Sequence, residues 1–133
     1  MTHRRPGVRA GSSAVELSIV LPFLAFLFVI TADFGRVFYY SQTIENCARK
    51  GAIYGADLQA AAQSPYTSLQ QAALADASSL NPQPTVTSTN TNDSSGNPCV
   101  QVTVAWTFKT VTAFPGIPNA VNLSRTVQMR VVQ

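Results

Sequence analysis

Histidine and acidic side chains are scarce in this chain of 133 residues. It has one histidine, His3, and six Asp or Glu residues, and only 11% of its residues are charged. A single histidine near the N-terminus leaves the rest of the chain without a Ser-His-Asp or Cys-His triad and without a histidine-based metal site. The acids beyond residue 33 form no paired-carboxylate motif, although residues distant in sequence can still meet in space. We therefore expect no catalytic residue, metal, cofactor or small-molecule substrate.

The excess of positive charge is confined to the first nine residues. Arg4, Arg5 and Arg9 account for the net charge of +3, because the other six basic residues balance the six acidic ones. Binding of nucleic acid needs Lys and Arg clustered on a folded element. The sequence therefore predicts no nucleic-acid partner.

A long apolar run follows this basic leader. Residues 14–32 read AVELSIVLPFLAFLFVITA and contain one charge, Glu16. As a helix this run spans roughly 28 Å, close to the thickness of the hydrocarbon core of a bilayer. A cleaved signal peptide has a shorter apolar core and small residues at its end, whereas Phe38, Tyr39 and Tyr40 follow here. We predict a retained transmembrane helix over residues 12–33.

The leader also predicts the orientation of the chain. Basic residues accumulate on the cytoplasmic side of a span, so residues 1–11 are expected in the cytoplasm. Residues 34–133 then form a head on the periplasmic or extracellular side of the inner (cytoplasmic) membrane. The sequence thus predicts a single-pass protein with three parts.

Helical spacing continues beyond the predicted span. Residues 34–56 lack proline and keep apolar or small residues three to four apart, which predicts one rod of some forty residues. The small residues Ala48, Gly51 and Gly55 line one face, which can approach another backbone closely. We expect this face to pack on a sheet within the chain, with Trp106 or Phe108 filling the notch, while contact with another subunit is the alternative.

The rest of the head has a different periodicity. A Ser-Pro start signal and a stop at Asn81 and Pro82 predict a second short helix over residues 66–80. Alternation of apolar and polar residues predicts strands over residues 99–109 and 123–132, and a Thr-rich segment over residues 85–91 is typical of an edge strand. The predicted fold is α+β, with a long N-terminal transmembrane helix extending into a small head of one short helix and a three-stranded antiparallel sheet.

Residues around the start of the apolar run resemble a known processing site. GSSAVE at residues 11–16 is similar to a type IV prepilin junction, in which a membrane peptidase cuts after the glycine and a glutamate is the fifth residue of the product. Cutting between Gly11 and Ser12 would make Glu16 the fifth residue. An ordered set of motifs resembles the TadE-like family more specifically: AVEL (residues 14–17), LP (21–22), DFGR (33–36) and ARKGAIYGA (48–56).

This resemblance implies a pilin-like fold and a role in a filament system. TadE-like proteins act as pseudopilins or minor components of tight-adherence (Flp) pilus assembly and secretion systems. The expected partners are the inner membrane, other pilin-like subunits, the pilus assembly machinery and a prepilin-type peptidase. The alternative is an uncleaved, membrane-anchored envelope protein whose head binds a soluble ligand or a cell-wall polymer.

Glu16 has two interpretations. A charged residue at the centre of a span costs roughly 2.5 to 3.5 kcal/mol and less near the interface, so a hydrated position at the cytoplasmic surface explains it without any role. With the resemblance, we favour pairing between Glu16 and the new α-amino group of Ser12 on the same or a neighbouring subunit, which would set the register between subunits.

Three further features of the sequence carry predictions. Pro22 removes a backbone hydrogen bond within the span and is a candidate kink, unless it is an ordinary membrane proline. Asp33 and Arg36 are spaced to pair on the helix surface at the membrane exit. Cys47 and Cys99 lie outside the membrane in this topology, which predicts a disulfide, with two buried free thiols as the alternative.

Overall fold

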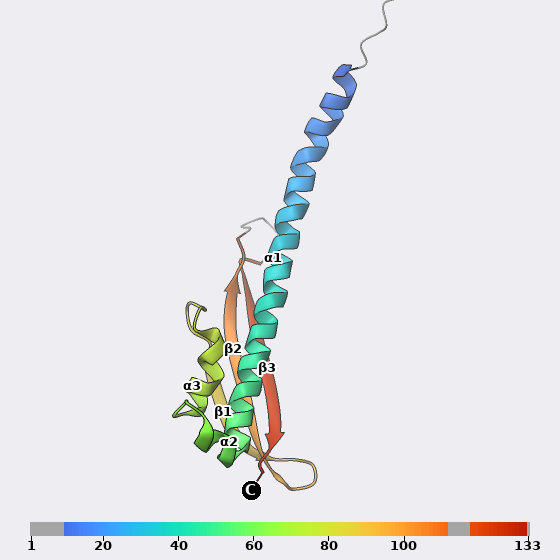
Figure 1. The fold of residues 1–133 in the computed structure, drawn as a ribbon. Helices are drawn as coiled ribbons and strands as arrows, with labels where there is room; N and C mark the ends of the chain where they lie inside the picture. Colours follow the sequence, from blue (N-terminus) through green and yellow to red (C-terminus); the bar gives the residue numbers. More distant parts are fainter. Residues whose placement is uncertain (1–9, 112–117, 133) are drawn as a thin grey trace, which may run out of the picture.

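One helix runs through the first part of the molecule. The structure is a computed structural model that describes residues 10–111 and 118–132. Helix α1 (Ala10–Ala56) has 47 residues and continues through Pro22. Its first half stands clear of the rest of the chain, and its second half lies along a sheet (Figure 1). The predicted continuous rod is confirmed.

The short helices differ from the sequence prediction. One short helix was expected, at residues 66–80, and the structure has two. Helix α2 (Leu58–Gln63) precedes that segment, and α3 (Leu69–Leu74) lies within it and continues into the 3₁₀ turn η1 (Ala75–Ala77). Helix α2 was missed because its signal is a single cap, the Asp57 carboxylate, which accepts hydrogen bonds from the backbone N–H groups of Gln59 and Ala60 at 2.9 and 3.0 Å. Helix α3 starts later than predicted because Ser68 is its N-cap.

The sheet is an antiparallel meander with the order β1-β2-β3. Its strands are β1 (Thr85–Asn92), β2 (Pro98–Lys109) and β3 (Ala120–Arg130). Strand β1 lies at an edge, as predicted, and β3 begins three residues earlier than predicted because Ala120 and Val121 pair with the end of β2. Strand β2 extends past β1, since Ala105 pairs with Thr85 and residues 106–109 pair only with β3.

The core lies between α1 and one face of this sheet. Alternate residues of β2 are buried against α1, as the alternation predicts. Its largest fully buried side chains are those of Phe108, Ile44, Val102, Val104 and Cys47.

The small residues of α1 pack inside the chain, as expected, but against other partners than predicted. A Cβ atom on Gly55 would lie 2.8 Å from Leu69 Cδ1 and 2.9 Å from Val100 Cγ1, and one on Gly51 would lie 3.0 Å from the Cβ atom of Ala73. Trp106 and Phe108 do not fill this notch. Strand β2 runs antiparallel to α1, which brings its beginning to Gly55 and its end to the part of α1 nearest the span.

Candidate functional site

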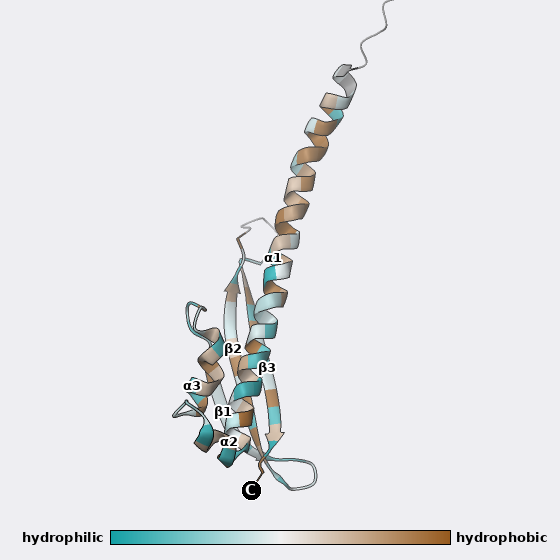
Figure 2. Ribbon diagram, viewed as in Figure 1, coloured by the Kyte–Doolittle hydropathy of each residue, from teal (hydrophilic) through white to brown (hydrophobic). Residues whose placement is uncertain are grey.

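The first half of α1 is apolar and exposed on all sides. Figure 2 shows that the hydrophobic stretch of α1 extends beyond the head. By length and composition α1 can cross a membrane, and none of its most apolar stretch is buried by other parts of the described chain. Its exposed large side chains are Val15, Leu17, Ile19, Val20, Leu21, Phe23, Leu24, Leu27, Phe28 and Val29. In water this surface would be unfavourable, so it requires lipid or other apolar helices around it.

The residues of the prepilin-like junction lie at the start of this exposed segment. Gly11 is in the first turns of α1, and a Cβ atom there would meet nothing within 4 Å. Ser12 and Glu16 both belong to α1. Glu16 is exposed, so a neighbouring subunit can reach it.

Asp33 lies on α1 where the exposed apolar segment meets the head. Its carboxylate pairs with Arg36 at 3.2 Å, which confirms the predicted pair. It also accepts a hydrogen bond from the backbone N–H of Val111 at 3.1 Å, just after β2. Asp33 is only 7% exposed, and buried carboxylates require such partners. The contact with Val111 was missed, because an isolated acid at the end of an apolar run does not identify a backbone donor 78 residues away.

A second polar contact ties α1 to the sheet. The Arg125 guanidinium of β3 donates a hydrogen bond to the buried hydroxyl oxygen of Ser41 on α1. This contact was not predicted, although the alternation of β3 places Arg125 on the same face as Leu123 and Val127. Two polar contacts therefore hold the head against α1 on the side nearest the span.

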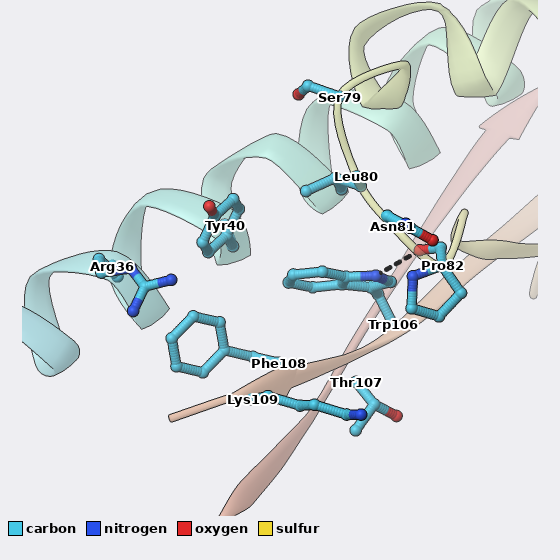
Figure 3. A pocket seen from close by; sticks show the side chains of 10 residues that line it. All are labelled: Arg36, Tyr40, Ser79, Leu80, Asn81, Pro82, Trp106, Thr107, Phe108 and Lys109. Carbon is cyan, nitrogen blue, oxygen red and sulfur yellow. Dashed lines mark hydrogen bonds between the residues drawn. The ribbon is translucent and has the colours of Figure 1, made fainter. Parts of the chain in front are cut away.

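An aromatic cavity lies between the part of α1 around Tyr40 and the end of β2. Tyr40, Trp106 and Phe108 form its wall, with ring centroids of Tyr40 and Trp106 5.0 Å apart. The Arg36 guanidinium lies 5.1 Å from the centroid of the Phe108 ring, and the Trp106 indole N–H donates to the carbonyl oxygen of Pro82 at 2.7 Å (Figure 3). The cavity has a volume of about 300 Å³. The alternation of β2 predicted this aromatic face, whereas the cavity depends on the loop at Pro82.

The predicted disulfide is not formed in the structure. Cys47 and Cys99 are both buried and free. Cys47 belongs to the core between α1 and the sheet. Cys99 directly precedes Val100 in β2, so the two side chains lie on opposite faces of the sheet, and Cys99 lies outside that core cluster. Burial raises the pKa of the Cys47 thiol, and the negative charge of Asp76 raises it further. The alternative of two buried thiols therefore describes the structure.

No group of three or more His, Cys, Asp or Glu residues that could hold a metal ion occurs in residues 10–111 and 118–132. Residues 114–117 and the arginines of the leader lie outside the described residues.

Comparison with known proteins identifies one relationship. The model of the TadE-like protein family matches residues 11–52, which include the junction, the span and most of the part of α1 in the head. The predicted TadE-like resemblance is confirmed over this segment. No curated protein and no solved structure matches the chain.

Proposed function

We propose that this chain, TadE-like over residues 11–52, is a pseudopilin or minor pilin that acts in the assembly of a tight-adherence (Flp) type IV pilus or a related secretion system. The proposal rests on one observation: the residues matched by the family model include the whole exposed apolar half of α1. The role is structural and non-catalytic: one helix anchors the head in a membrane and packs against the helices of other subunits.

The shape of the molecule supports this role. The exposed half of α1 is long enough to be held by lipid before assembly and by neighbouring helices afterwards, because both surround it with apolar groups. The head leaves this segment uncovered (Figure 2). The same surface can therefore serve the membrane and the assembly.

Glu16 supplies specificity in this proposal. Helices packed only through apolar side chains can slide along one another, whereas a carboxylate must find a cationic partner in an apolar environment. Cleavage after Gly11 would create such a partner at the α-amino group of Ser12. We propose that this pairing sets the register between subunits.

The proposed location is the inner membrane, with the leader in the cytoplasm and the head in the periplasm or outside the cell, and with entry into a pilus as a further step. The basic leader supports this orientation through the positive-inside rule.

Intact-mass measurement of the protein from native membranes tests the proposal. Loss of residues 1–11, together with co-purification of pilus components, is the expected result. A full-length protein that never co-purifies with pilus components would support the uncleaved envelope protein instead. A Gly11→Leu variant serves as a control, because a bulky residue at the cut site should block processing without removing the span.

A further inference from the structure

The Arg36 end of the cavity beside Trp106 lies at the depth of the lipid headgroups if α1 spans a membrane. At about 1.5 Å per residue, Arg36 is about 6 Å and Tyr40 about 12 Å beyond Ala32, the last residue of the apolar run. The headgroup layer extends about 5 to 8 Å from the hydrocarbon on each side of a bilayer. Arg36, at one end of the cavity, therefore lies within this layer, and Tyr40 lies just beyond it.

The side chains around the cavity are typical of this layer. Tryptophan and tyrosine are enriched at the interface between membrane and water, and Trp106 and Tyr40 form the cavity wall. Phe34, Phe38 and Tyr39 are exposed on α1 at the same level. Ser79 and Asn81, in the segment that leads to Pro82, also line the cavity, with Asn81 beside the Trp106 ring (Figure 3).

The charges of the head are unevenly distributed along α1. The half nearest the span contains three cations, Arg36, Lys109 and Arg125, and one acid, Asp33, a net charge of +2. The distal half contains three cations and four acids, a net charge of −1. The cations are Arg49, Lys50 and Arg130, and the acids are Glu45, Asp57, Asp76 and Asp93. The positive half thus faces the membrane surface, a distribution complementary to anionic lipid.

Two of these cations border the cavity itself. Arg36 points toward Phe108 and keeps 44% of its side chain exposed despite its pair with Asp33. Lys109 extends along the other side of β2 beside Thr107, at the rim. A phosphodiester group beside Arg36 can accept hydrogen bonds from the outer guanidinium nitrogens, while the headgroup beyond the phosphate contacts the aromatic wall at Tyr40, which lies farther from the hydrocarbon.

We propose that this cavity binds the phosphodiester headgroup of an anionic phospholipid in the leaflet that the head faces. The lipid would hold the head upright on the bilayer before assembly. The inference rests on the membrane anchoring in the proposed function, but it requires no pilus partner.

Trp106 is the only tryptophan in the chain, so its fluorescence reports on the cavity directly. The experiment reconstitutes the full chain in nanodiscs of phosphatidylcholine with increasing phosphatidylglycerol and follows Trp106 emission. We expect a shift to shorter wavelength that saturates with phosphatidylglycerol. Each cation should contribute about a fivefold preference for the anionic lipid, so Arg36→Gln and Lys109→Gln should each weaken the preference by about that factor.

Three comparisons make the result decisive. Arg49→Gln removes a cation of the distal half and should leave the lipid preference unchanged, and Arg36→Lys should retain most of it. Native mass spectrometry of the same nanodisc samples should find fewer retained phosphatidylglycerol molecules on Arg36→Gln, which separates lost binding from a changed indole environment.

Equal Trp106 emission in anionic and zwitterionic nanodiscs would overturn the inference. So would an equal response to free phosphate or glycerophosphoglycerol added to phosphatidylcholine nanodiscs, because that would identify a site for soluble anions. Either result would leave the pilus function intact, since that function depends on cleavage and on contacts of the exposed half of α1.

Discussion

The Asp33 carboxylate on α1 accepts a hydrogen bond from the backbone N–H of Val111, at 3.1 Å, across 78 residues of sequence. Asp33 therefore follows the apolar run of α1 directly and also fastens the end of β2 to the helix. Arg36 pairs with the same carboxylate and lies over the Phe108 ring. This cluster determines how the head meets the exposed apolar part of α1.

Removal of the Asp33 carboxylate should loosen the head. A hydrogen bond to a charged group contributes about 1.5 to 3 kcal/mol, so Asp33→Ala should lower the free energy of unfolding by about that amount. The thermal unfolding transition in detergent, followed by Trp106 fluorescence, measures the change. Glu45→Gln is the control, because it removes an exposed pair with Arg49 that contributes only about 0.3 to 0.5 kcal/mol. Equal effects of the two variants would show that the contact with Val111 carries no weight.

Two glycines of α1 should respond in opposite ways to alanine. Gly55→Ala places a Cβ atom 2.8 Å from Leu69 Cδ1 and 2.9 Å from Val100 Cγ1, and overpacking of this kind costs about 1 to 3 kcal/mol. At Gly35 a Cβ atom meets nothing within 4 Å, so Gly35→Ala should leave stability unchanged or raise it by up to about 1 kcal/mol through helix propensity. Thermal unfolding of both variants tests this, and a stabilised Gly55→Ala would contradict the packing.

The two cysteines should be free thiols protected by the fold. Alkylation in denaturant without reductant should label both Cys47 and Cys99, and the native protein should react slowly. Intact mass distinguishes this outcome from a disulfide, which would leave both residues unlabelled.

The raised pKa of Cys47 also gives stability a pH dependence. Above the pKa of an unfolded thiol, about 8.5, the unfolded chain loses the Cys47 proton while the folded chain retains it. The unfolded state then binds fewer protons, so the contribution of Cys47 to stability is present below this pKa and is lost as the pH rises through the folded pKa. Unfolding of the wild-type protein should become easier above about pH 8.5, and Cys47→Ala should remove this part of the pH dependence.

Glu16→Ala should separate membrane insertion from assembly. The variant removes a charge from the exposed half of α1, so insertion should be unchanged or improved. Crosslinking to pilin-like subunits should fall, because the proposed partner of the Ser12 amino group is lost. Glu45→Gln, an acid on α1 within the head, is the matched control. Unchanged crosslinking in Glu16→Ala would contradict the register role.

Much of the architecture could be predicted because its signals are local and repeated. The apolar run and the spacing up to Ala56 specify one long helix, and the alternation of residues 99–109 specifies a half-buried strand. The pair of Asp33 and Arg36 was also predictable, since residues three apart on a helix share a face. Helix α2 was missed because a single cap at Asp57 is a weak signal beside the periodicity that surrounds it.

Contacts between distant segments could not be predicted in the same way. Because β2 runs antiparallel to α1, Gly55 lies against Val100 and Arg36 lies over Phe108. The orientation of a strand relative to a helix cannot be predicted from a local sequence pattern. The disulfide was predicted from the expected compartment and the number of cysteines alone. The alternation of side chains along β2 places Cys99 outside the core cluster that contains Cys47.

By itself, then, the sequence determined a long apolar helix, a TadE-like N-terminal segment and an α+β head, because hydrophobic periodicity and motifs are properties of neighbouring residues. Only the tertiary structure decided that Asp33 holds Val111, that Arg125 reaches Ser41, and that Tyr40 and Trp106 enclose a cavity beside Arg36. These contacts join residues far apart in the chain, and they exist only once β2 and β3 pack along α1 in one direction and one register.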